Sequence, residues 1–227
     1  MNRFIAAASA IAMLSGCVSL VPEQEAPGAL YRIGPVAEAT EIAFTRSILI
    51  RQPEAPRILS GAEISARDAK GRIRVVKGAE WADRPTRMMQ LALLDYIGAG
   101  GGGVALAPNT GSRAEFELSW RLSEFALEGN LAVARAELTL LDGKTRSPIR
   151  QLTVNSQVEA INDKTSSRAL ALSEAGREIV RSAGRFIAET TTADTGADID
   201  TDTGEGSGAD KSAPDAGTAD IVSETIK

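Results

Sequence analysis

Alternating apolar and polar residues give the strongest secondary-structure signal in this chain. Every second position from Phe116 to Leu122 is a large apolar residue, and the positions between them are Glu, Ser and Arg. A period of two predicts a β-strand with one buried face and one solvated face. The apolar pattern resumes at Phe125 on the opposite parity, which predicts a β-bulge near 123–124.

Two turns extend this strand into a meander. Glu-Gly-Asn at 128–130 leads into an apolar segment at 131–141, and Asp-Gly at 142–143 leads into another at 149–160. Because short polar connections of this kind are typical of hairpins, we expect three long antiparallel strands. Shorter strands are predicted at 44–50, 63–68, 72–76 and 104–107, with Ala69-Lys70-Gly71 as a hairpin turn between the second and the third.

Helical spacing appears in two segments. The first begins at Asp83, the expected N-cap, has Pro85 in its first turn and ends near Ile97, before Gly98. Its apolar positions are Met88, Met89, Leu91, Leu93, Leu94 and Tyr96. The second covers about 166–190, and its apolar stripe is Leu172, Gly176, Ile179, Ala183, Phe186 and Ile187. The order of these elements predicts a single α+β domain in which both helices pack on one face of a mixed, largely antiparallel sheet.

The first residues are similar to the signal of a bacterial lipoprotein. Arg3 precedes an apolar segment from Phe4 to Leu14, and Leu-Ser-Gly-Cys at 14–17 resembles a lipobox. The resemblance implies cleavage before Cys17, lipidation of its thiol and a stable membrane anchor. Val18 stands where an aspartate would favour retention in the inner membrane, so we expect the periplasmic face of the outer membrane. An ordinary secretory signal that contains a cysteine is the alternative.

Composition divides the chain into four parts. Residues 1–16 form the predicted signal peptide, and 17–30 are the lipidated cysteine with a proline-containing flexible tether. Residues 31–190 form the α+β domain, and 191–227 are an acidic, disordered tail of small and polar residues. The whole chain carries −5 and the residues from 193 onward carry −7, so the rest carries +2. Such a balance gives no support to nucleic-acid binding through a basic face.

Most common catalytic chemistry is excluded by composition. The chain has no histidine and one cysteine, so it cannot form a Ser-His-Asp or Cys-His site, a disulfide framework or a Cys/His zinc site. The glycines at 98–103 lack the Lys-Ser/Thr of a phosphate loop and follow a helix, which favours a connector. Glu115 with Glu117, or Glu124 with Glu128, could serve as a glycosidase pair. A solvated strand face is the better interpretation of Glu115 and Glu117, and we find no aromatic sugar platform beside them. We therefore expect no enzyme activity, no metal and no cofactor.

Trp81-Ala82-Asp83, just before the first helix, has two interpretations. The tryptophan can pack on the helix as a hydrophobic staple, with Asp83 as its cap. Alternatively, Trp81, Asp83 and Arg84 can contact a partner protein.

From about Tyr31 to Phe186 the chain resembles the ABC-type transport auxiliary lipoproteins. The resemblance begins with the lipobox and the strand Tyr31-Arg32-Ile33 after the tether, and it continues with a proline-containing stretch that ends in Ile58-Leu59. The last of its recognisable motifs are Trp81-Ala82-Asp83 and the helix that follows, which contains Leu91 and Leu94. The family usually has Tyr-Leu in place of Ile58-Leu59 and Trp-Ala-Glu in place of Trp81-Ala82-Asp83.

The resemblance implies a non-catalytic accessory subunit of an intermembrane lipid transporter. Members of the family, including the paraquat-inducible type, are outer-membrane partners of MCE-domain proteins, which work with a permease and an ATPase. Docking on the MCE-domain protein would complete a lipid path, with phospholipid as a candidate ligand and ring-like self-association as a further implied property. A structural or chaperone-like lipoprotein of an outer-membrane assembly machine is the second hypothesis.

Overall fold

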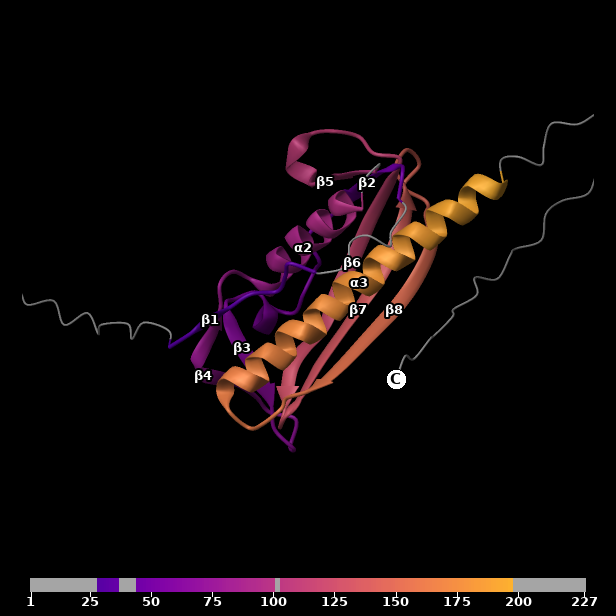
Figure 1. Ribbon diagram of the computed structural model, residues 1–227. Coiled ribbons are helices and arrows are strands. Elements are labelled where there is room, and N and C mark those ends of the chain that lie inside the picture. Colours follow the sequence, from indigo (N-terminus) through magenta and orange to yellow (C-terminus); the bar gives the residue numbers. More distant parts are fainter. Residues whose placement is uncertain (1–27, 37–43, 101–102, 198–227) are drawn as a thin grey trace, which may run out of the picture.

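Three long strands joined by short turns make up most of the sheet. The computed structural model describes residues 28–36, 44–100 and 103–197. In it β6 (Phe116–Glu128), β7 (Leu131–Asp142) and β8 (Pro148–Glu159) form an antiparallel meander (Figure 1). The register between β6 and β7 shifts between Leu122 and Glu124, so the predicted bulge is confirmed. Gly129, in the turn after β6, has φ 61°, a conformation that suits glycine.

Two short strands share the other edge of β6. β2 (Ser47–Ile50) pairs in parallel with the start of β6, and β3 (Glu63–Arg67) pairs in parallel with its end. The sheet order is β1-β4-β3-β6-β2-β5, and β7 and β8 follow on the far edge of β6. The remaining elements are β1 (Leu30–Tyr31), β4 (Ile73–Trp81), β5 (Val104–Leu106) and two 3₁₀ turns, Arg57–Leu59 and Pro108–Thr110.

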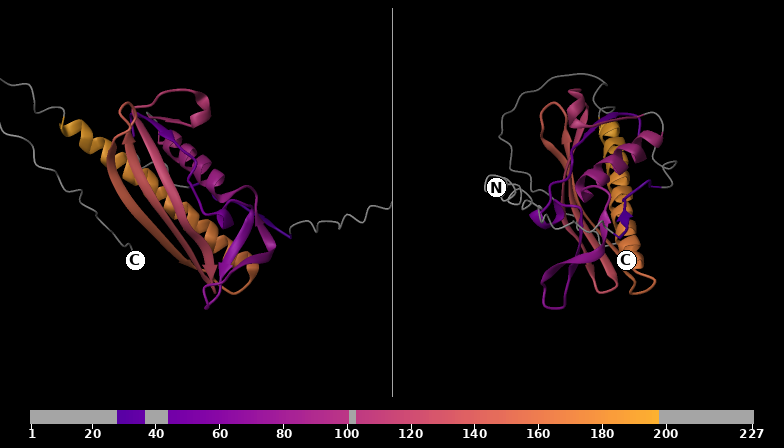
Figure 2. Two further views of the ribbon diagram at one scale, coloured as in Figure 1. Left: turned by 180° about the vertical axis from the view of Figure 1, so that it is seen from behind. Right: turned by 90° about the vertical axis from the view of Figure 1, so that its left-hand side faces the viewer.

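Both long helices cover the same face of the sheet. α2 (Pro85–Ala99) and α3 (Thr165–Ala197) lie side by side on one face, and the other face is left open (Figure 2). The predicted α+β fold, with a mixed sheet and two helices on one face, is therefore confirmed. The core lies between the helices and the meander, and the predicted apolar stripe of α3 is buried in it. A Cβ at Gly176 would lie 3.1 Å from Cδ1 of Ile33, so the glycine allows a close approach there.

The first helix differs from its prediction at its start. It begins at Pro85, and Arg84 takes the N-cap position without a side-chain cap hydrogen bond, so the prediction of Asp83 as the N-cap is wrong. The fixed φ of proline suits the first helical position, which moves the cap to the preceding residue. Leu91 was placed in the apolar stripe, but it is 43% exposed.

Two elements are longer than their sequence patterns indicate. β4 continues to Trp81, although the apolar pattern stops at 76. α3 continues past Thr190 to Ala197, beyond the predicted boundary between the domain and the tail. The hydroxyls of the buried Thr190 and Thr191 donate to the carbonyl oxygens of Phe186 and Ile187, at 2.7 and 2.9 Å. These bonds satisfy the hydroxyls within the helix, so both threonines are buried without an unpaired polar group.

Candidate functional site at the junction of β4 and α2

Trp81 is the last residue of β4, and its side chain lies in the core. The side chain is 2% exposed, and its ring stacks on Phe125 with 5.3 Å between centroids and 25° between planes. Its backbone N–H donates to the carbonyl oxygen of Ala62 at 2.7 Å. These contacts favour a packing role and leave almost none of the indole surface for a partner.

Asp83 and Arg84 follow Trp81 and lie at the surface. Asp83 Oδ1 accepts a hydrogen bond from the backbone N–H of Arg84 at 2.7 Å, and Oδ2 lies 3.1 Å from Nε of Arg87. A carboxylate just before the first turn of α2 also interacts favourably with the positive end of the helix dipole. Arg84 is exposed and carries its charge at the same end of the helix.

The exposed face of α2 continues from these residues. Arg87 and Leu91 are four positions apart, so they lie on one side of the helix. We call Asp83, Arg84, Arg87 and Leu91 the α2 surface. The sequence pattern did not identify Leu91 as a surface residue, because Leu91 also fits the apolar spacing of the buried side of the helix. Its polar neighbours at 87 and 95, four positions away in either direction, are the signal that could have identified it.

Two glutamine side chains fix the start of α2 against the sheet. Gln52 Nε2 donates to Oγ1 of Thr86 at 2.7 Å, and Gln90 Nε2 donates to the carbonyl oxygen of Ile50 at 2.8 Å. Thr86 and Gln90 are buried, so these bonds form where water cannot replace them. The α2 surface therefore stands on a rigid support.

The glutamates considered as acid/base pairs are held by arginines. Glu115 accepts from Nε of Arg46 at 2.6 Å, and this hydrogen bond holds the pKa of the Glu115 carboxyl below its usual range. Glu124 and Glu128 are both paired with Arg67.

Glu117 was expected on a solvated face, but it is 4% exposed. It is paired with Arg51 and with Arg146, whose Nη1 lies 2.8 Å from Oε2 of Glu117. The reason is that two arginines from flanking loops close over this part of the open face. The ion pairs of Glu117 with Arg51 and Arg146 are typical of a structural role.

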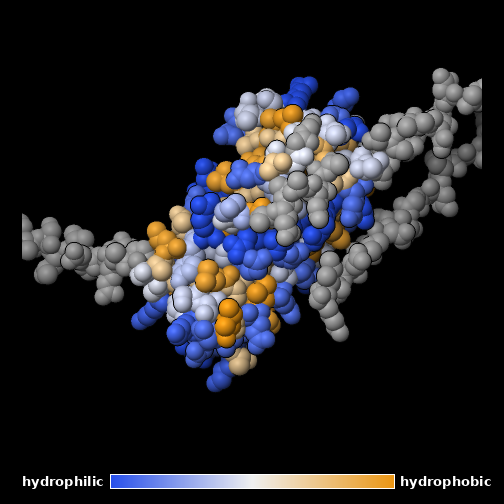
Figure 3. Space-filling model, in the orientation of Figure 1, coloured by the Kyte–Doolittle hydropathy of each residue, from blue (hydrophilic) through white to orange (hydrophobic). Residues whose placement is uncertain are grey.

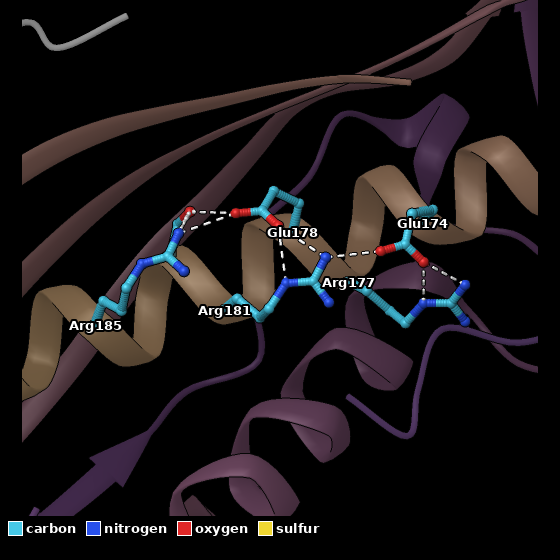
Figure 4. Close-up of polar contacts among 6 residues, drawn as sticks. Glu174, Arg177, Glu178, Arg181 and Arg185 are labelled. Carbon is cyan, nitrogen blue, oxygen red and sulfur yellow. Dashed lines mark hydrogen bonds and ion pairs between the residues drawn. The ribbon is translucent and has the colours of Figure 1, made fainter. Parts of the chain in front are cut away.

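A ladder of ion pairs runs along α3 (Figure 4). Glu174 is paired with Arg177 and Arg181, and Glu178 with Arg181 and Arg185, at 2.5–2.9 Å. Burial raises the pKa of Glu174, but hydrogen bonds from Arg181 and Arg177 outweigh it and hold the pKa below its ordinary value. The ladder stabilises the exposed side of the helix, which is a structural role.

Two hollows among the described residues are small. One, between β8 and the C-terminal half of α3, measures about 100 Å³, and one over β6 and β7 measures about 120 Å³. Sites that enclose a small molecule usually measure roughly 300–1,000 Å³. In the described part of the chain we find no cluster of His, Cys, Asp and Glu that could hold a metal ion, and none of its helices is both long and apolar enough to cross a membrane. Cys17 lies outside the described residues, so its lipidation stays a prediction.

Comparisons with known proteins identify the family to which this small α+β domain belongs. A family model described as the ABC-type transport auxiliary lipoprotein component matches residues 31–183. The chain therefore belongs to the ABC-type transport auxiliary lipoprotein family. Membership in this family indicates a membrane-anchored lipoprotein that associates with an ABC transporter. No curated protein matches the chain.

Solved structures support the same fold. The crystal structure of protein XCC0632 from Xanthomonas campestris superposes with a TM-score of 0.62 at 20% identity, covering 67% of this chain and 90% of the other. A second crystal structure, of an uncharacterized protein, gives a TM-score of 0.57 at 14% identity and covers 70% of this chain and 97% of the other. At these identities the similarity concerns the fold alone.

Proposed function

We propose that this protein is a non-catalytic accessory subunit of an intermembrane lipid transporter of the ABC/MCE type. It is anchored through lipidated Cys17 at the periplasmic face of the outer membrane, and its domain docks on an MCE-domain protein. The observation that carries the proposal is the family match over residues 31–183. The lipobox at 14–17 agrees with it.

The α2 surface is the docking site in this proposal. It combines two exposed arginines with Leu91, on a helix that buried hydrogen bonds hold in place. Arginine is among the residues that contribute most to binding when it lies at the centre of an interface. Trp81 supports this surface from the core side and takes no direct part in the contact.

The protein contributes a surface to the lipid path. Neither of the hollows of about 100 and 120 Å³ is large enough to enclose a phospholipid, which agrees with this role. The lipid would instead pass along a path that the docked domain, together with its partner or with further copies of itself, completes.

Affinity purification of the full-length lipoprotein from mildly solubilised envelopes tests the proposal. Mass spectrometry should recover an MCE-domain protein with its permease or ATPase, and the N-terminal peptide should carry acyl chains on Cys17. Recovery of an outer-membrane assembly barrel without an MCE-domain protein would refute the transport function and favour the assembly hypothesis.

Matched arginine variants test the α2 surface. Arg84→Ala should reduce recovery of the partner about tenfold, as expected for an interface contact worth about 1.4 kcal/mol. Arg113→Ala, at an exposed arginine outside the α2 surface, is the control and should leave recovery unchanged. Equal recovery with both variants would show that the partner binds elsewhere.

A further inference from the structure

The hairpin formed by β3 and β4 is basic and carries exposed apolar side chains. From residue 69 to 77 it has no acidic residue and four basic ones, which are Lys70, Arg72, Arg74 and Lys77. Between them, Ile73 is 48% exposed and Val75 is 52% exposed. Residues 69–75 are all exposed, so no other part of the described structure covers this segment. Exposed apolar residues interleaved with basic ones are typical of segments that lie at a membrane surface.

The two exposed apolar side chains share one face of the hairpin. Ile73 pairs with Arg67 across the hairpin, and Val75 lies two residues further on the same face. Arg67 in turn reaches Glu124 and Glu128 on β6. Asp68 Oδ2 lies 2.8 Å from Nε of Arg72 and 3.5 Å from Nη2 of Arg74, so these three carboxylates are already paired with arginines. Arg72 and Arg74 alternate with Ile73 and Val75 and lie on the opposite face of the strand, so the tip of the hairpin carries apolar side chains on one face and arginines on the other.

The turn of the hairpin is held rigidly. Gly71 has φ 76°, and its N–H donates to the carbonyl oxygen of Asp68 at 2.8 Å. Asp68 Oδ1 also accepts from the backbone N–H groups of Lys70 and Arg72, both at 3.0 Å. The hairpin projects from the body at the lower left of the right-hand view in Figure 2. A preformed projection loses little conformational entropy when it binds a surface.

The expected anchor keeps this hairpin within reach of the membrane. Leu30 in β1 pairs with Glu80 of β4, and the seven residue steps from Glu80 to Ile73 span about 23 Å in a strand. The thirteen steps from Cys17 to Leu30 can span up to roughly 43 Å. A bilayer that holds the acyl chains of Cys17 is therefore close enough for the hairpin to contact it. This step rests on the proposed lipidation.

We propose that the β3–β4 hairpin is a membrane-contact element. Ile73 and Val75 enter the headgroup region of the bilayer that holds Cys17. Lys70 and Lys77, together with Arg72 and Arg74 beside Asp68, bind the phosphates of anionic phospholipids. The combination of one lipid anchor and one basic, apolar patch gives two attachment points, which fixes the orientation of the domain on the membrane. An acidic protein partner would match the charge, but the apolar side chains and the nearby anchor favour a bilayer.

Fluorescent labelling at two equally exposed valines tests the proposal. Val75 and Val104 are 52% and 53% exposed, and Val104 lies in β5, away from the hairpin. In the lipidated full chain, Cys17 has no free thiol, so Val75→Cys and Val104→Cys can each be labelled singly with an environment-sensitive NBD dye. The proteins are reconstituted into vesicles of phosphatidylethanolamine and phosphatidylglycerol with a nitroxide-labelled lipid. We expect a blue-shifted emission and strong lipid quenching at position 75, and neither at position 104.

Charge removal and salt provide the second measurement. Changing Lys70, Arg72, Arg74 and Lys77 together to glutamine should reduce quenching at position 75 to the level at 104, because each basic residue near an anionic surface raises binding about fivefold. Phosphatidylcholine vesicles and 0.5 M salt should weaken the quenching in the same direction. Circular dichroism confirms that each variant is folded.

Two results would overturn the membrane-contact proposal. Equal emission and quenching at 75 and 104 would overturn the proposal. Shielding of position 75 in native envelopes but not in lipid vesicles would also overturn it, because it would identify a protein as the occupant. If the unsubstituted chain itself takes up the dye at Cys17, the proposed lipidation fails. The hairpin is then tested by adding the same vesicles to the Cys17→Ser form of each labelled variant.

Discussion

Replacing Trp81 with alanine separates a packing role from a partner contact. The indole is 2% exposed and stacks on Phe125 at 5.3 Å. Truncation of a buried tryptophan costs about 3–5 kcal/mol, of which the aromatic pair accounts for about 0.5–1.5 kcal/mol. For a domain of this size each kcal/mol lowers the Tm by about 2–4 °C, so we expect a fall of about 6–20 °C. That loss is a large share of the ~5–15 kcal/mol that stabilises a typical domain.

Urea unfolding, followed by circular dichroism and by the fluorescence of the remaining Trp120, measures this loss. A double-mutant cycle with Phe125→Leu should give an interaction energy of about 0.5–1.5 kcal/mol between the two rings. Arg84→Ala is the control, and its stability should stay within about 0.5 kcal/mol of the unsubstituted protein. A loss below 1 kcal/mol for Trp81→Ala, together with reduced recovery of the partner, would refute the packing role.

Four further substitutions are tested by chemical denaturation. Gly176→Leu should destabilise the protein by about 1–3 kcal/mol, because its Cβ would press on Ile33, whereas Gly98→Ala, with open space around its Cβ, should stabilise α2 by about 0.5–1 kcal/mol. Glu174→Gln should lower the free energy of unfolding by up to about 1 kcal/mol at pH 7 and should leave it unchanged near pH 2. The sign follows from the lowered pKa of Glu174: its contribution is present above the unfolded pKa of about 4.3 and is lost as the pH falls through the folded pKa. Glu117→Gln should lower the free energy of unfolding by about 1–3 kcal/mol, because it removes the charge of a buried carboxylate that pairs with Arg51 and Arg146. A loss below about 0.5 kcal/mol would contradict this.

The meander could be predicted from sequence because each local signal agreed with the tertiary structure. The alternation over 116–122 matches one covered and one open face, and the change of parity at Phe125 matches the bulge. The turns at 128–130 and 142–143 leave the strands only one way to pair.

The helix errors have a different origin. Leu91 fits an apolar spacing on either side of α2, and only the packing against the sheet decides which side is buried. The extension of α3 to Ala197 depends on threonines that are poor helix formers by themselves. Tertiary burial of Thr190 and Thr191 overrides that preference, and a pattern read along one chain does not contain such long-range contacts.

The position of Trp81 was the harder part of the site to predict. Residues 73–78 of β4 are mostly exposed, and the register between β3 and β4 shifts near Gly78, whose φ is 77°. The shift interrupts the alternation, so the pattern appears to end at 76 and leaves the tryptophan in an apparent loop.

Once the strand reaches residue 81, the packing interpretation applies to Trp81, and the proposed partner contact is left to Asp83 and Arg84. The chain leaves the core within two residues, from an indole that is 2% exposed to an Asp83 side chain that is 43% exposed. A substitution at Trp81 should therefore change stability first and partner binding only through it, whereas a substitution at Arg84 should change binding at constant stability. Partner recovery measured after each variant has been shown to be folded distinguishes the two, since only a loss at constant stability identifies a contact.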